Sequence, residues 1–91
     1  MYGYVMNKKA LQDRLKRIEG QVRGLQRMVD EDQYCIDVLT QVNSVTAALR
    51  GVGMGLLDDH VRHCVRESIE QGQGDEKVEE LMSAVARFAG K

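Results

Sequence analysis

Hydrophobic residues in the first third of the chain recur at steps of four and three, as they do on one face of a helix packed against other helices. The pattern extends over about 7–30 and stops at an acidic cluster, Asp30-Glu31-Asp32. The repeating positions are Leu11, Leu15, Ile18, Val22, Leu25 and Met28 or Val29. We therefore predict a first helix over about 7–30.

A second helix is predicted to run to about residue 68, with Asp32 capping its amino end. Its apolar stripe consists of Val38, Val42, Val45, Leu49, Val52 and Leu56. Three glycines, Gly51, Gly53 and Gly55, occupy its middle, where each weakens a helix by roughly 1 kcal/mol relative to alanine. We expect either that another backbone comes close at these glycines or that the helix is kinked there.

The turn-forming sequence Gly72-Gln73-Gly74 ends this region, and Asp75 is placed to cap a short third helix. The apolar side of that helix carries Val78, Leu81, Met82, Val85 and Phe88. Proline is absent and aromatic residues are few, which favours long helices over strands. The predicted fold class is all-α, with three helices in one domain over 1–91 and a flexible tail at 1–6.

The small size of the chain bears on its assembly. A monomer of 91 residues buries only roughly 60 to 65% of its extended surface, so we expect it to associate with copies of itself. No run approaches the roughly 18 apolar residues that span a bilayer, and the first residues lack the apolar run of a secretion signal. We expect a cytoplasmic protein without a membrane partner. In that reducing compartment a pair of cysteines more often binds a metal or reacts than forms a disulfide.

Charge is unevenly distributed along the chain, although the formal net charge is only −1. Residues 7–27 contain seven basic and two acidic side chains, whereas residues 66–80 contain two basic and six acidic ones. A local cluster of cations can bind nucleic-acid phosphates whatever the total charge is, because counterion release depends on nearby cations. The alternative is an ordinary solvated helix face.

The two cysteines and one histidine form the second candidate feature. His60 and Cys64 are four residues apart, so a helix places both side chains on one face. Cys35 extends the same apolar stripe at its other end. Two thiols and one imidazole suit Cu(I) well and Zn(II) adequately, and offer little to Mg(II), Ca(II) or Mn(II). The alternative is that the thiols are small core residues and the histidine is a satisfied interior group.

Helix geometry separates Cys35 from the other two residues. A straight helix would put Cys35 and His60 about 37 Å apart at roughly 1.5 Å per residue. If two copies of the second helix lie antiparallel and cross near residues 48 and 49, Cys35 of one copy falls opposite His60 and Cys64 of the other. Ala47, Ala48 and Gly51 beside the crossing would allow close approach. His63 faces about 100° away from Cys64 and is predicted to lie at the surface.

From Asn7 to Phe88 the chain resembles the copper-sensitive operon repressor (CsoR) family of bacterial transcriptional regulators. The resemblance rests on the segments 14–24 (RLKRIEGQVRG) and 34–41 (YCIDVLTQ), on His60 and Cys64, and on Gly72-Gln73-Gly74 followed by Glu79-Glu80-Leu81. It implies an antiparallel dimeric four-helix bundle that pairs into a tetramer. It also implies a repressor that binds operator DNA when metal-free, releases it on taking up Cu(I), and controls copper-resistance genes.

The resemblance further implies a role for individual residues. Cys35 of one protomer and His60 and Cys64 of its partner would be the metal ligands. Tyr34 and Glu80 would link ligand geometry to DNA affinity, with the alternatives of an interfacial tyrosine and a solvated glutamate. Arg14 is the best match to a DNA-binding residue, and weaker matches are Lys16, Arg17, Arg23 and Arg50. Some relatives are basic at the position of Gly51, so this part of the DNA surface differs here.

Other functions remain open. Nickel and cobalt sensors of the same superfamily add an N-terminal histidine ligand, a region occupied here by Tyr2, Gly3 and Tyr4. Persulfide sensors have both thiols but lack the histidine at position 60, and formaldehyde sensors usually lack the second thiol. A metal-buffering helical protein that binds no operator is a further alternative. An enzyme with Cys64 as nucleophile is remote, because nothing else in the chain indicates an oxyanion site or a pocket for a small-molecule substrate.

Overall fold

The computed structural model describes residues 7–90, and within this range the chain is helical and contains no strand. The predicted flexible tail at 1–6 lies outside the described residues. The elements in chain order are α1 (Lys8–Asp30), α2 (Cys35–Asp59), the π-helical turn η2 (His60–Val65), α3 (Arg66–Glu70) and α4 (Gly74–Phe88). The all-α prediction is confirmed. No helix in the described part of the chain is long and apolar enough to cross a bilayer.

The chain forms two compact units, which are described separately. One unit is Asn7–Met54, formed by α1 and most of α2, and residues 55–90 belong to the other. The boundary falls inside α2, next to the glycines that the sequence places there. Gly51, Gly53 and Gly55 are all α-helical, so they do not end the helix.

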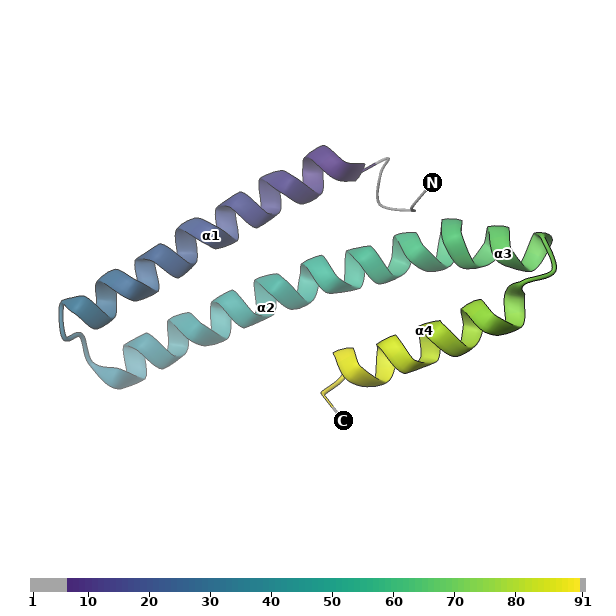
Figure 1. Ribbon diagram of the computed structural model, residues 1–91. Coiled ribbons are helices and arrows are strands. Elements are labelled where there is room, and N and C mark those ends of the chain that lie inside the picture. Colours follow the sequence, from purple (N-terminus) through teal and green to yellow (C-terminus); the bar gives the residue numbers. More distant parts are fainter. Residues whose placement is uncertain (1–6, 91) are drawn as a thin grey trace. The chain divides into compact units, whose positions relative to one another are not determined.

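In the first unit, α1 and α2 run side by side in opposite directions (Figure 1). Ile18 of α1 is buried against Val45 and Val52 of α2, and Leu11, Leu25 and Ala48 pack around them. The predicted apolar stripe of α2 therefore divides into two faces. Val45 and Val52 face α1, whereas Val42 and Leu49 are exposed. Burial of Ile18, Val45 and Val52 removes apolar surface from water and stabilises the helix pair.

The turn between α1 and α2 differs from the prediction. Asp32 adopts a left-handed conformation with φ of 55° instead of capping α2. The amide of Gln33 donates to the carbonyl of Met28, and that of Asp32 donates to Val29. These two bonds form a Schellman motif, which closes the carboxyl end of α1. The second helix begins two residues later than a cap at Asp32 predicts, at Cys35, with the Tyr34 carbonyl accepting from the amides of Asp37 and Val38.

Asp32→Gly is expected to stabilise the protein by about 0.5–1 kcal/mol, because glycine adopts positive φ without a Cβ penalty. The substitution also removes a negative charge from the carboxyl end of a helix, where it is unfavourable. Thermal unfolding measures the gain, and Asp32→Asn separates the charge effect from the backbone effect. The matched control is Glu31→Gly, since Glu31 has a φ of −88° and should lose stability. A lower Tm for Asp32→Gly would contradict the prediction.

The second unit is built around η2, α3 and α4, and α4 contacts both of the others. Val65 and Ser68 are its buried residues. Gly72, with φ of 79°, ends α3 through a second Schellman motif, in which the Gln73 amide donates to the Ser68 carbonyl. A Cβ on Gly74 would lie 2.6 Å from Cγ1 of Ile69, so glycine allows α4 to begin directly against α3. Consequently α4 starts at Gly74, and Asp75 lies in its first turn instead of capping it.

Candidate metal centre and basic surface

The described structure places His60 and Cys64 together on η2, the turn that continues α2. A π-turn closes hydrogen bonds over five residues instead of four, and such turns occur often at functional sites. The sequence predicts an uninterrupted α-helix here, which is wrong for these six residues. His60 and Cys64 are partly exposed, so both can reach an ion. His63 is exposed, as predicted.

Glu80 connects His60 to α4. Nε2 of His60 lies 3.9 Å from Oε1 of Glu80, while Nζ of Lys77 lies 3.8 Å from Oε2 of the same carboxylate. Each carboxylate oxygen therefore faces a different nitrogen donor. Because Nε2 of the imidazole is turned toward Glu80, Nδ1 is the other ring nitrogen that could bind a metal. The contact between Glu80 and His60 is consistent with the orienting groups that metal-binding histidines use.

Lys77 was not singled out by sequence reasoning. The spacing of three residues between Lys77 and Glu80 on a helix is a signal that could have identified it.

Cys35 and Tyr34 lie in the first unit, at the start of α2. Both side chains are exposed, and Tyr34 retains 66% of its accessible surface. Neither Cys35 nor Cys64 is part of a disulfide. Within residues 7–90 no group of three histidine, cysteine, aspartate or glutamate side chains is arranged to hold a metal ion. The described chain thus brings His60, Cys64 and Glu80 into one unit and leaves Cys35 and Tyr34 in the other.

The basic residues of α1 fall into two groups. Lys9 pairs with Asp13 at 3.2 Å, and Arg23 pairs with Glu19. The remaining cations have no carboxylate partner among the described residues, and they are Lys8, Arg14, Lys16, Arg17 and Arg27. These unpaired cations are all exposed and are available to an external anion.

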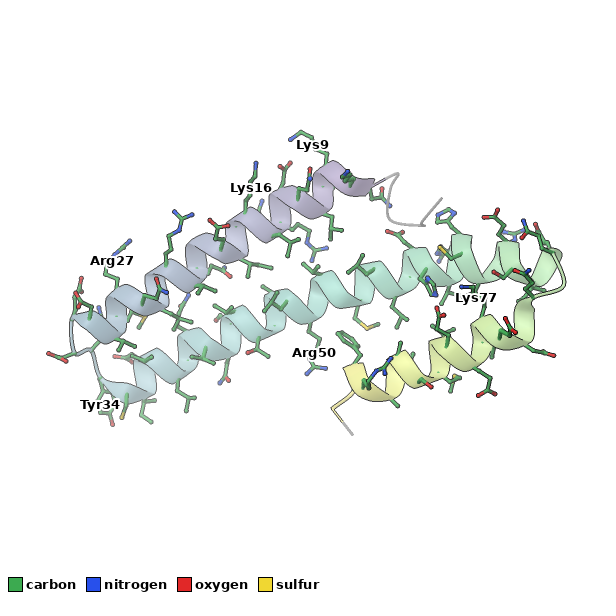
Figure 2. The ribbon with its side chains drawn as sticks, viewed as in Figure 1. Lys9, Lys16, Arg27, Tyr34, Arg50 and Lys77 are labelled. Atoms are coloured by element: carbon green, nitrogen blue, oxygen red, sulfur yellow. The ribbon has the colours of Figure 1, made fainter. Side chains whose placement is uncertain are left out.

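Two of the predicted DNA-binding residues, Lys16 and Arg50, do not lie on one face of the unit. Lys9, Lys16 and Arg27 project from the side of α1 that faces away from α2, whereas Arg50 projects from the side of α2 that faces away from α1 (Figure 2). One copy of this unit therefore does not bring Arg50 onto the same face as Lys16.

Arg14 and Gly51 meet across the two helices. A Cβ built on Gly51 would lie only 2.9 Å from Nη2 of Arg14. The sequence predicts a neighbouring backbone or a kink at the glycines of α2. Among the described residues the close neighbour of Gly51 is this side chain from α1, whereas close approach of the backbone of a second copy stays a prediction.

Comparison with known proteins identifies the class. The sequence pattern of the metal-sensitive transcriptional repressors matches residues 7–87, so the chain belongs to this family. A family of repressors confirms the expectation of a regulatory protein instead of an enzyme.

Individual relatives are copper-sensing repressors. The chain is 50% identical to the copper-sensing transcriptional repressor RicR of Mycobacterium tuberculosis over 89 residues, which cover 96% of this chain and 93% of RicR. It is 47% identical to CsoR of Bacillus subtilis over 81 residues, covering 89% and 80% of the two chains. The resemblance to the CsoR family is therefore confirmed.

Two solved structures share the fold. The crystal structure of CsoR with Cu(I) from Geobacillus thermodenitrificans superimposes with a TM-score of 0.89 at 48% identity, covering 93% of this chain and 88% of that one. The nickel-responsive regulator InrS superimposes with a TM-score of 0.77 at 40% identity, covering 88% and 90%. The fold thus accommodates both copper and nickel sensing, and the metal must be argued from the ligands.

Proposed function

We propose that this protein is a Cu(I)-responsive repressor that binds operator DNA when metal-free and releases it when Cu(I) binds, so that copper-resistance genes are expressed. The observation that carries the proposal is the donor set on a repressor fold: two thiols, Cys35 and Cys64, and an imidazole, His60, whose Nε2 is turned toward Glu80. A cytoplasmic location follows from this role, because there the thiols stay reduced.

The chemistry of the donors favours copper over nickel. Cu(I) is a soft ion that two thiolates and one imidazole satisfy, and its binding fixes these three groups in one arrangement. Nickel prefers additional nitrogen donors, and the chain has only one other histidine, His63, which is exposed. The relatives at 50% and 47% identity are copper-sensing proteins, which agrees with this choice.

We infer that the site is shared between two protomers of an antiparallel dimer, with Cys35 from one and His60 and Cys64 from the other. The exposed apolar face of α2 supports this inference. Leu39, Val42 and Leu49 retain 39 to 55% of their accessible surface on the single chain, and a second α2 would cover them. Pairing of two such dimers gives a tetramer, with Arg50 and the cations of α1 contributed by several subunits.

The switch is a coupling between two binding equilibria. Copper must bind the DNA-free protein more tightly than the DNA-bound protein, typically by about 1–3 kcal/mol, and DNA must weaken copper binding by the same amount. Glu80 on α4 is the residue placed to transmit the change, because it contacts the imidazole of a ligand and belongs to a different helix. Tyr34 is adjacent to Cys35, and we propose that it links the geometry of the Cys35 ligand to DNA affinity.

An anaerobic titration tests this function. The metal-free protein is bound to a fluorescent operator duplex obtained by selection from random-sequence DNA, and Cu(I) is added in the presence of a competing chelator. We expect one ion per chain and a fall in anisotropy as the sites fill. Ni(II) added to a parallel sample should leave the complex intact. Absence of salt-sensitive DNA binding would favour a metal buffer instead, and release by Ni(II) alone would contradict the choice of metal.

A second candidate is a thiol- or persulfide-responsive repressor of the same fold. The exposure of the Cys35 thiol favours it, since accessible thiols are the ones that react with oxidants and sulfur donors. This candidate does not require His60, which makes the two functions distinguishable by substitution.

A further inference from the structure

Gly51 occupies a position where the backbone does not require glycine. It lies in the interior of the 25-residue helix α2, and its φ is not positive. Glycine is unfavourable in such a position because it loses more conformational freedom on folding than other residues do. The reason for a glycine at position 51 must therefore lie in the atoms that pack against it from outside α2.

The reason is the guanidinium of Arg14. At 2.9 Å from Nη2, a Cβ at position 51 would be closer than real Cβ contacts allow, so Arg14 could not keep its place. Gly20 of α1 provides a contrast, because a Cβ there would meet nothing within 4 Å. Because Gly51 has no side chain, α2 leaves room at this position for the guanidinium of a residue on α1.

The seated guanidinium keeps its charge available. Arg14 has no carboxylate partner in the described part of the chain, whereas Lys9 and Arg23 of the same helix are ion-paired. A long side chain loses rotamer freedom when it binds an anion, and support from a neighbouring surface reduces that loss beforehand. Arg14 thus has no carboxylate partner among the described residues, and its guanidinium lies over Gly51 of α2.

We propose that Gly51 is a positioning residue that seats Arg14 against α2 and holds its guanidinium ready for a phosphate of the operator backbone. The inference rests on the proposed function, because the anion is taken to be DNA. It assigns DNA affinity to a residue that carries no charge and no hydrogen-bonding side chain.

Gly51→Ala is the test, and it separates positioning from folding. Arg14 ends in a flexible group that can move away, and alanine is a better helix former, so Tm should equal or exceed that of the wild type. Affinity of the metal-free protein for the selected duplex should fall roughly threefold to tenfold. The slope of log Kd against log salt should also decrease, because fewer phosphates are neutralised. Cu(I) affinity and the sedimentation coefficient are measured on the same variant, because Gly51 also lies beside the predicted crossing of two α2 helices, and the loss is assigned to Arg14 only if both values equal those of the wild type.

The Arg14→Ala background provides the decisive control. Arg14→Ala should weaken DNA binding, and adding Gly51→Ala to it should have no further effect, because the side chain being positioned is gone. Gly20→Ala calibrates the rise in Tm that comes from helix propensity alone. Unchanged DNA affinity in Gly51→Ala, or the same loss in both backgrounds, would overturn the proposal. A wild-type protein that does not bind the duplex would instead overturn the proposed function.

Discussion

Cys35→Ser is expected to abolish release of DNA by Cu(I) while leaving the DNA affinity of the metal-free protein unchanged. The wild-type ratio of DNA affinities between the metal-free and Cu(I)-loaded states should be about 5- to 150-fold, and the variant should reduce it to one. The reason is that Cys35 is one of the proposed metal ligands, while its exposed thiol takes no part in the buried core. Anisotropy titration with the selected duplex, with and without Cu(I), measures the ratio.

His60→Ala separates the copper sensor from the thiol sensor. The proposed copper site includes the imidazole, so this variant should also lose release by Cu(I). A persulfide or disulfide switch needs only Cys35 and Cys64, so it should still respond to a sulfur donor. His63→Ala is the matched control, because His63 belongs to the same turn but is exposed. Retention of Cu(I)-driven release by His60→Ala would refute the proposed ligand set.

The sequence predicts the helices well, since hydrophobic periodicity is strong in each of them. The first helix is predicted over about 7–30 and observed over Lys8–Asp30. Helix ends were less predictable. Aspartate is favoured both as an amino-terminal cap and in left-handed turns, so the identity of Asp32 cannot distinguish these roles. Hydrogen bonds from the turn to Met28 and Val29 decide between them.

Other features depend on tertiary contacts that one sequence does not display. The residues of the π-turn at His60–Val65 are equally compatible with an α-helix. Over six positions, hydrophobic periodicity does not distinguish the two kinds of helix. The stripe on α2 predicts an apolar helix but not which residues face α1. Val45 and Val52 face it and Leu49 does not. Likewise, the glycine at 51 signals a close neighbour without identifying it as Arg14.

The proposed metal ligands also differ in how far the sequence alone predicts their positions. Spacing predicts that His60 and Cys64 share a turn, which the structure confirms. The family resemblance adds Glu80, and the structure places its carboxylate 3.9 Å from His60. The contribution of Cys35 stays a prediction, because it depends on a second chain. It can be tested through the surface that would bring the two chains together.

Leu49→Glu is expected to dissociate the assembly and, as a result, to weaken Cu(I) binding. Leu49 is 47% exposed on the single chain and lies where two antiparallel copies of α2 are predicted to cross. The substitution removes an apolar contact and puts two like charges near the two-fold axis, and both changes oppose association. Sedimentation velocity should show a monomer, and chelator competition should show a lower affinity for Cu(I).

Gln26→Glu makes a matched change of charge at an exposed position of α1, and it should preserve both assembly and Cu(I) affinity. Circular dichroism distinguishes dissociation from unfolding, because the Ile18, Val45 and Val52 contacts lie within one chain and do not involve Leu49. A monomeric Leu49→Glu protein with the Cu(I) affinity of the wild type would contradict a shared site, since one chain would then supply every ligand. An intact assembly would place the subunit interface on another face. Loss of assembly together with Cu(I) affinity is the result expected if Cys35 comes from a second protomer.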